Sequence, residues 1–115
     1  MPVRRAVEAH RSGGLNCAQS ILRAFQAECG VPEDAIVQAR RYGGGRAESG
    51  RCGALHAAIE LTPDPGERER IRLAFVARTG SERCREIRAG KTLSCEQCVA
   101  LAAALLVETP QRRAP

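Results

Sequence analysis

Aromatic residues are almost absent from this chain, which has no tryptophan, one tyrosine and two phenylalanines among 115 residues. Few side chains could therefore stack on nucleic-acid bases, and the basic residues behind the net charge of +5 are scattered along the sequence. The apolar fraction of 43% comes mainly from Ala, Leu, Ile and Val, which suit closely packed helices better than sheets. These absences disfavour both an all-β fold and a nucleic-acid partner.

Long hydrophobic runs are also lacking. The longest, from Val99 to Val107, is far too short to cross a bilayer, and the charged start M-P-V-R-R-A-V-E-A-H has no apolar signal segment behind it. We expect a cytoplasmic protein without membrane insertion. Six cysteines would suit a secreted disulfide scaffold, but in a reducing compartment they are more typical of metal-binding, catalytic or redox chemistry.

Helical periodicity recurs along the whole chain, with short turns between the periodic segments and no alternating strand pattern. Residues typical of helix starts stand at Asn16, Pro32, Ser81 and Ser94, and glycines typical of helix ends at Gly13, Gly14, Gly30 and Gly90. The sequence predicts a single all-α domain over residues 1–115, a compact bundle of about five to six short helices with a frayed tail at 110–115. A thioredoxin fold is not expected, because its strands are missing.

Three cysteines, Cys17, Cys52 and Cys95, stand in the first turn of a predicted helix. Unpaired amide groups and the helix dipole favour the thiolate there, lowering the pKa of a cysteine from about 8.5 towards neutrality. Ser94 and Gln97 form an S-x-x-Q capping box that strengthens the start at Cys95. Because the thiolate is both the nucleophile and the metal ligand, these positions predict chemical use.

The remaining cysteines differ in their surroundings. Cys84 lies in a short predicted helix, Cys98 completes a C-x-x-C with Cys95, and Cys29 lies in an apolar stripe, where packing explains it. His56, one turn after Cys52, is either a ligand, a partner of the thiolate or a buried histidine bonded to a backbone carbonyl. Two loop arginines near Cys52 could stabilise its thiolate or bind a small anion, namely Arg46 and Arg51.

The ordered motifs G-L-N-C-A-Q, Y-G-G-G-R, C-G-A-L-H-A, C-R-E and C-x-x-C-V resemble the redox-active protein family named for its C-G-A-x-x-G motif and separated cysteines. The resemblance covers roughly residues 13 to 107 and implies a small bacterial protein, of a kind often associated with transporter loci, whose redox role is inferred from four cysteines. It places these at Cys17, Cys52, Cys84 and Cys95, with Cys98 and Cys29 additional.

Two positions depart from this family pattern: Ala57 replaces the expected Gly, which should tighten a helix contact, and His56 replaces a small hydroxyl residue. The cysteine pattern also resembles part of the split-Soret cytochromes, which carry an iron–sulfur centre beside their haems. This chain has no C-x-x-C-H for haem attachment.

Three interpretations therefore stay open. In the first, a thiol–disulfide or electron-transfer protein acts on an unidentified thiol substrate or redox partner: Cys52 or Cys95 attacks, and the mixed disulfide is resolved by Cys84, Cys17 or Cys98. In the second, zinc or an iron–sulfur cluster is held by Cys17, Cys52, Cys84 and Cys95, with His56 or Cys98 as further candidate ligands. In the third, a helical protein binds a partner and its cysteines only pack. The Ala-rich last helix suits an internal contact or a homodimer interface.

Overall fold

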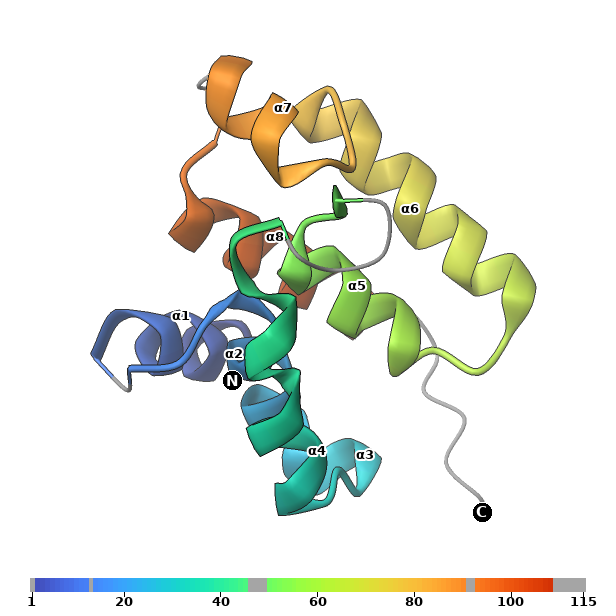
Figure 1. The fold of residues 1–115 in the computed structure, drawn as a ribbon. Helices are drawn as coiled ribbons and strands as arrows, with labels where there is room; N and C mark the ends of the chain where they lie inside the picture. The colour runs from blue at the N-terminus through green and yellow to red at the C-terminus, as the bar shows by residue number, and fades with distance from the viewer. Residues whose placement is uncertain (1, 13, 46–49, 91–92, 109–115) are drawn as a thin grey trace.

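The computed structural model describes residues 2–12, 14–45, 50–90 and 93–108, so the predicted tail at 110–115 lies outside it. Within these ranges the chain forms α-helices, one 3₁₀ helix and no β-strand, which confirms the all-α prediction (Figure 1). The elements are α1 (Pro2–Ser12), α2 (Cys17–Ala24), α3 (Gln26–Cys29), α4 (Glu33–Gln38), η1 (Ala39–Gly45), α5 (Gly53–Glu60), α6 (Pro65–Thr79), α7 (Cys84–Gly90) and α8 (Cys95–Glu108).

The helices of the described residues outnumber the predicted five to six because two predicted segments are divided. The segment from residue 17 to residue 29 is interrupted at Phe25, whose φ of −106° and ψ of 13° separate α2 from α3. The segment that begins near Pro32 continues beyond α4 as the 3₁₀ helix η1. Periodicity alone does not detect such breaks, because the apolar spacing continues through them.

Capping boxes fix the starts of α2 and α8. The Gln19 amide donates to the Asn16 side chain at 2.8 Å, and the Asn16 amide donates to Gln19 Oε1 at 3.1 Å. At α8 the Gln97 amide donates to Ser94 Oγ at 3.1 Å, and the Ser94 amide donates to Gln97 Oε1 at 2.8 Å. Both predicted starts are confirmed, and each places a cysteine as the first helical residue.

The start of α7 differs from its prediction. Ser81 accepts a hydrogen bond from the Arg83 amide at 3.0 Å and therefore shapes the turn that precedes the helix, which begins only at Cys84. Consequently Cys84 is also a first helical residue.

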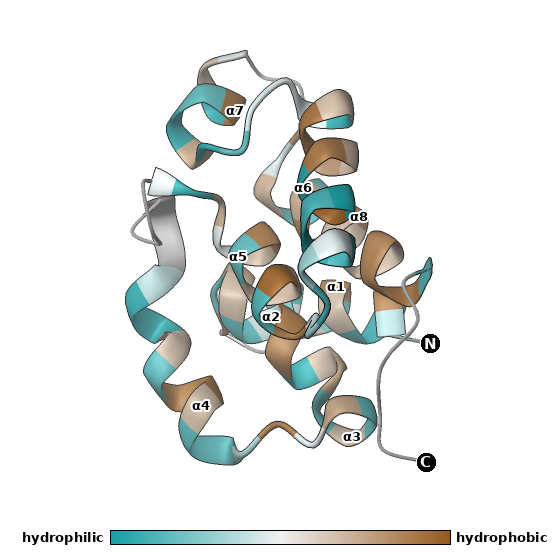
Figure 2. Ribbon diagram, turned by 90° about the vertical axis from the view of Figure 1, so that its right-hand side faces the viewer, coloured by the Kyte–Doolittle hydropathy of each residue, from teal (hydrophilic) through white to brown (hydrophobic). Residues whose placement is uncertain are grey.

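The core lies where α2, α5 and α8 pack together, with α1 against α2 and α8 and with α6 against α5 and α8. Hydrophobic residues gather on these central helices, whereas α6 carries many hydrophilic residues (Figure 2). The Ala-rich face of α8 is used internally, since Ala102, Ala103 and Leu106 are fully buried. Small side chains on this face allow the helices to approach closely, and burial of each large apolar side chain contributes about 1.5–3 kcal/mol.

Gly53 marks a close approach between backbone segments. A Cβ atom at this position would lie 2.9 Å from the Tyr42 carbonyl oxygen and 3.2 Å from the Ala18 amide nitrogen, and both of these are backbone atoms that cannot easily move. The glycine of the C-G-A motif therefore lets the start of α5 sit directly against α2 and η1. This contact places Cys52 beside the start of α2.

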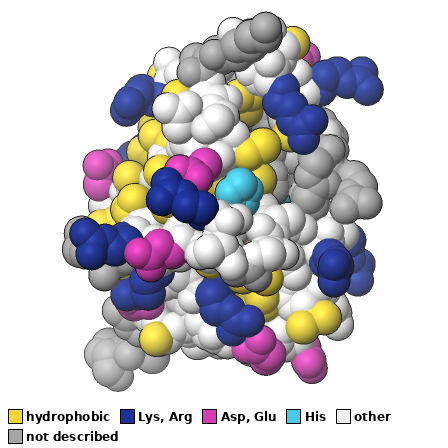
Figure 3. All heavy atoms as spheres, turned by 90° about the vertical axis from the view of Figure 1, so that its left-hand side faces the viewer, with side chains coloured by type: hydrophobic (Ala, Val, Ile, Leu, Met, Phe, Trp, Pro, Cys, Tyr) yellow, Lys and Arg dark blue, Asp and Glu magenta, His cyan; other side chains and the backbone are white. Residues whose placement is uncertain are grey.

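The surface carries charges of both signs. On the face seen in Figure 3, Lys and Arg side chains are dispersed and alternate with Asp and Glu, without a continuous basic patch. Within the described ranges no single helix is long and apolar enough to cross a membrane, although α7 and α8, bent by 119°, meet the criteria of length and composition as a pair.

Candidate functional site: a cavity lined by cysteines

Five of the six cysteines line one small cavity, called here the sulfur cavity: Cys17, Cys52, Cys84, Cys95 and Cys98. Its wall is completed by Ile87, Arg88 and Leu93. The cavity volume is only about 10 Å³, roughly the space of one water molecule. Thus the five residues that the sequence singled out for sulfur chemistry are brought together, and all of them are free thiols.

Helix starts deliver these thiols to one place. Cys17, Cys84 and Cys95 are the first residues of α2, α7 and α8, Cys52 is the N-cap of α5, and Cys98 lies one turn into α8. Four helices therefore direct their N-terminal ends towards the same small volume.

Hydrogen bonds and an ion pair between residues 51–52 and residues 82–83, called here the clasp, hold the starts of α5 and α7 together. The Cys52 amide donates to the Glu82 carbonyl oxygen at 2.7 Å, and Arg51 forms an antiparallel bridge with Arg83. The Arg51 guanidinium pairs with the Glu82 carboxylate at 3.1 Å, and Glu82 also pairs with Arg72 at 3.2 Å. Arg51, predicted to act on the Cys52 thiolate or on an anion, thus has an ion-pair partner in this clasp, while Arg46 lies outside the described residues.

Access distinguishes Cys95 from the other four. The exposed fractions of Cys17, Cys52, Cys84 and Cys98 are 8%, 4%, 9% and 3%, whereas Cys95 is only half-buried. Cys95 also lines an open depression on the surface together with Arg88, Leu93, Ser94 and Gln97. It is therefore the thiol of the cavity that an external molecule reaches first.

Cys52 is a buried thiol whose pKa is lowered. Hydrogen bonding from the Cys98 thiol lowers the pKa of Cys52 from 9.0 to about 7, against the opposing effect of burial. The backbone amides of Leu55 and Ala54 lower this pKa further, although neither forms a regular capping hydrogen bond with the sulfur. The helix start thus favours the Cys52 thiolate as predicted, and Cys98 keeps the proton, because donation to Cys52 and burial raise the pKa of Cys98.

Position at a helix start does not by itself produce a thiolate. Burial raises the pKa of Cys17, and the neighbouring Cys52 and Cys95 raise it further, so the predicted lowering is wrong for this residue. Burial likewise raises the pKa of Cys84, although Arg88 opposes this in part. The cost of desolvating a charge exceeds the benefit of the helix amides at both positions. For Cys95 the thiolate stays a prediction.

Two residues of the site were missed by the sequence analysis. Arg88 lies four residues after Cys84 on α7, and interactions with Cys84 and Cys95 raise its pKa. Helical i, i+4 spacing could have indicated this residue. His10 on α1 approaches Cys17, with 4.0 Å between Nε2 and Sγ. No local signal could have indicated His10, because tertiary packing of α1 against α2 makes the contact.

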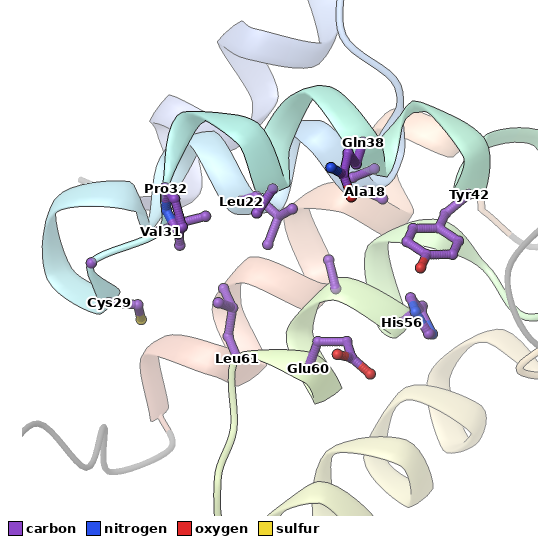
Figure 4. A pocket seen from close by; sticks show the side chains of 14 residues that line it. Ala18, Leu22, Cys29, Val31, Pro32, Gln38, Tyr42, His56, Glu60 and Leu61 are labelled. Atoms are coloured by element: carbon purple, nitrogen blue, oxygen red, sulfur yellow. The ribbon is translucent and has the colours of Figure 1, made fainter.

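Cys29 and His56 lie elsewhere, on an apolar cleft of about 360 Å³ (Figure 4). His56 packs against Tyr42, with 4.6 Å between ring centroids, and it is not among the residues that line the sulfur cavity. Leu22, Val31 and Leu61 supply much of the apolar wall. The sequence analysis therefore separated Cys29 correctly from the other five cysteines, whereas His56 is turned towards the cleft.

The donor set of the sulfur cavity suits zinc or an iron–sulfur cluster in kind, since four thiolates are a complete ligand set for either. In the described ranges, however, no three or more His, Cys, Asp or Glu side chains are arranged to hold a metal ion. A volume of about 10 Å³ also leaves no room for a cluster between the sulfurs. The thiols as arranged here therefore do not fit these groups.

Comparison with known proteins gives no relative: no family model, no curated protein and no solved structure matches this chain.

Proposed function

We propose that this chain is a small cytoplasmic thiol–disulfide redox protein, of the family that its C-G-A motif and separated cysteines resemble. The observation that carries the proposal is the convergence of five thiols on the sulfur cavity, one of them with its pKa lowered to about 7. Thiol–disulfide exchange needs a thiolate, a neighbouring thiol and access for the substrate, and these requirements are met by Cys52, Cys98 and Cys95 respectively.

Cys95 begins the proposed reaction because it is the accessible thiol. The Cys95 thiol gives its proton to solvent, its sulfur attacks a substrate disulfide RS–SR, a Cys95–SR bond forms, and RS⁻ leaves and takes up a proton from solvent. Cys17 donates a hydrogen bond to Cys95 and then attacks the Cys95 sulfur, which releases the second RS⁻. The proton of Cys17 passes to His10 Nε2, at 4.0 Å from the sulfur. The balance is one disulfide reduced to two thiols and one Cys17–Cys95 disulfide formed.

The ionised Cys52 then transfers the disulfide from the Cys17–Cys95 pair to the buried Cys52–Cys98 pair. Its thiolate attacks the Cys17 sulfur, forms a Cys52–Cys17 bond and releases Cys95 as a thiolate. Cys98, which shares a hydrogen bond with Cys52, then attacks the Cys52 sulfur, gives its proton to the departing Cys17 and completes a Cys52–Cys98 disulfide. Cys95 and Cys17 thereby return to the reduced state. The two electrons given to the substrate come from Cys52 and Cys98.

Native mass spectrometry of anaerobically purified protein tests this function. We expect a metal-free chain that loses two hydrogens for each equivalent of small disulfide and regains them with dithiothreitol. Iodoacetamide should label Cys95 before oxidation and should not label it in the Cys17–Cys95 form. Cys29→Ser is the matched control, because Cys29 does not line the sulfur cavity and its replacement should leave the oxidation intact.

Two results would overturn the proposal. A mass increment equal to a metal ion or cluster, with four thiols protected, would establish the metal site instead. Six thiols that stay unreactive in a metal-free chain would leave packing as the only role of the cysteines, as in a helical partner-binding protein.

A further inference from the structure

An open depression of about 480 Å³ lies outside the sulfur cavity and is lined by Arg88, Leu93, Ser94, Cys95 and Gln97. We call it the outer depression. Arg88, Leu93 and Cys95 also line the sulfur cavity, so the two hollows share a wall. A molecule held in the outer depression therefore lies against the accessible thiol of the redox site.

Arg88 gives the outer depression an unbalanced positive charge. Its side chain is exposed, and among the described residues no carboxylate forms an ion pair with it; its interactions are with Cys84 and Cys95. The nearest acidic residue in sequence to the outer depression, Glu96, is already paired with Arg11, at 2.6 Å. The guanidinium of Arg88 is thus available to an anion from solvent.

The size of the outer depression is that of a small-molecule site, since such sites span about 300–1,000 Å³. An arginine fork matches a carboxylate with two parallel hydrogen bonds and holds it in a defined orientation. A carboxylate bound in this way would place the rest of a small molecule near Cys95, because Arg88 and Cys95 line the same two hollows. The same charge would stabilise the thiolate that departs after the attack.

We propose that the substrate of this redox site is a small disulfide that carries a carboxylate near its sulfur and docks on Arg88 in the outer depression. This inference rests on the proposed function. Cys95 attacks the docked disulfide, one thiolate of the substrate leaves beside Arg88, and the second leaves when Cys17 attacks the Cys95 sulfur. Arg88 is a specificity-determining residue in this scheme.

Three aliphatic disulfides of similar size test the inference with the full reduced chain: 3,3′-dithiodipropionate is anionic, 2-hydroxyethyl disulfide is neutral and cystamine is cationic. The rate constant for oxidation is measured for each, and the quotient of the anionic and neutral rate constants is the readout. Loss of Arg88 also weakens its interaction with the cysteines, which affects all three reagents, and the quotient cancels that effect. We expect Arg88→Gln to lower the quotient by about tenfold, equivalent to one charge-assisted contact.

Arg85→Gln is the matched control, because Arg85 is exposed on the same helix, lines neither hollow and changes the net charge equally. We expect it to leave the quotient within about twofold, and Arg88→Lys to retain part of the preference. Equal loss in Arg85→Gln and Arg88→Gln, or no anionic preference in the wild type, would overturn the substrate class and leave the redox function standing. Failure of all three disulfides to oxidise the wild type would overturn both.

Discussion

The sulfur cavity and the apolar cleft both lie against α2 and the segment of α5, and they differ in almost every respect. The sulfur cavity is about 10 Å³ and is surrounded by thiols from helix starts, whereas the apolar cleft is about 360 Å³ and is lined largely by aliphatic side chains. Cys29, at the end of α3, belongs to the cleft. The difference indicates that the position of a cysteine within its helix, more than its presence, decides whether it lines the sulfur cavity.

Replacement of one cysteine from each hollow should give the largest contrast. We expect Cys95→Ser to slow oxidation by 2-hydroxyethyl disulfide about 100-fold, because a hydroxyl is a far weaker nucleophile than a thiolate and the other four thiols are buried. Cys29→Ser should leave the rate within about twofold. Stopped-flow or quenched labelling measures both rates, and a comparable loss in Cys29→Ser would erase the distinction between the hollows.

The close contact that places Cys52 can be broken at Gly53. We expect Gly53→Ala to lower the free energy of unfolding by about 2–3 kcal/mol, because the new Cβ meets backbone atoms of Tyr42 and Ala18. In Gly66→Ala, the added Cβ meets only the Asp64 side chain at 3.1 Å, so we expect a change below about 1 kcal/mol. Urea denaturation measures both variants, and an unaffected Gly53→Ala would contradict the packing described for the start of α5.

The ionised thiol should make stability depend on pH. The pKa of Cys52 is lowered from 9.0 to about 7, so between these values the unfolded chain holds a proton that the folded chain has lost. Stability from this group therefore rises with pH across that window by about 2 kcal/mol and is lost as pH falls through 7. The pKa values of Cys17 and Cys98 are raised, so the contribution of these two thiols to stability falls as pH rises above 9.

Cys52→Ser should remove the rise between pH 7 and 9, and Cys29→Ser should retain it. Denaturation at several pH values tests both variants. A Cys52→Ser profile that still rises as steeply as the wild type would show that another group is responsible.

Removal of the Cys98 hydrogen bond should have a smaller effect. Without that donor we expect the pKa of Cys52 to rise by about one in Cys98→Ala, since a hydrogen bond to a charged group contributes about 1.5 kcal/mol. Titration of the thiolate by its ultraviolet absorbance measures the shift, with Cys52→Ser to assign the transition. If the pKa of Cys52 is unchanged in Cys98→Ala, the helix amides alone would account for its lowered value.

Much of the fold could be predicted because its signals are local. Asn16 is predicted as an N-cap and Ser94 with Gln97 as a capping box, and both helices begin there. The break at Phe25 could not be predicted, because the apolar spacing continues across it. The helix starts at Cys17, Cys52 and Cys95 were predictable by the same local logic, whereas the start at Cys84 was not.

The electrostatics of the site depend on burial and neighbours that sequence does not encode locally. Cys17 and Cys52 have the same kind of position at a helix start, yet the pKa of Cys17 is raised and that of Cys52 is lowered. Tertiary packing brings the Cys98 donor to Cys52, and it also removes Cys17 from solvent. His10 entered the site for the same reason, through the contact between α1 and α2.

Disulfide mapping of the reduced chain after one equivalent of small disulfide tests directly whether the thiols of the sulfur cavity exchange with one another. Trypsin leaves Cys95 and Cys98 on one peptide and separates it from the peptides of Cys17, Cys29 and Cys52, so fragmentation can assign each bond. The account predicts a Cys17–Cys95 bond at early times, a Cys52–Cys98 bond later, and a reduced Cys29 throughout. Disulfides that involve Cys29, or links only between separate chains, would contradict it.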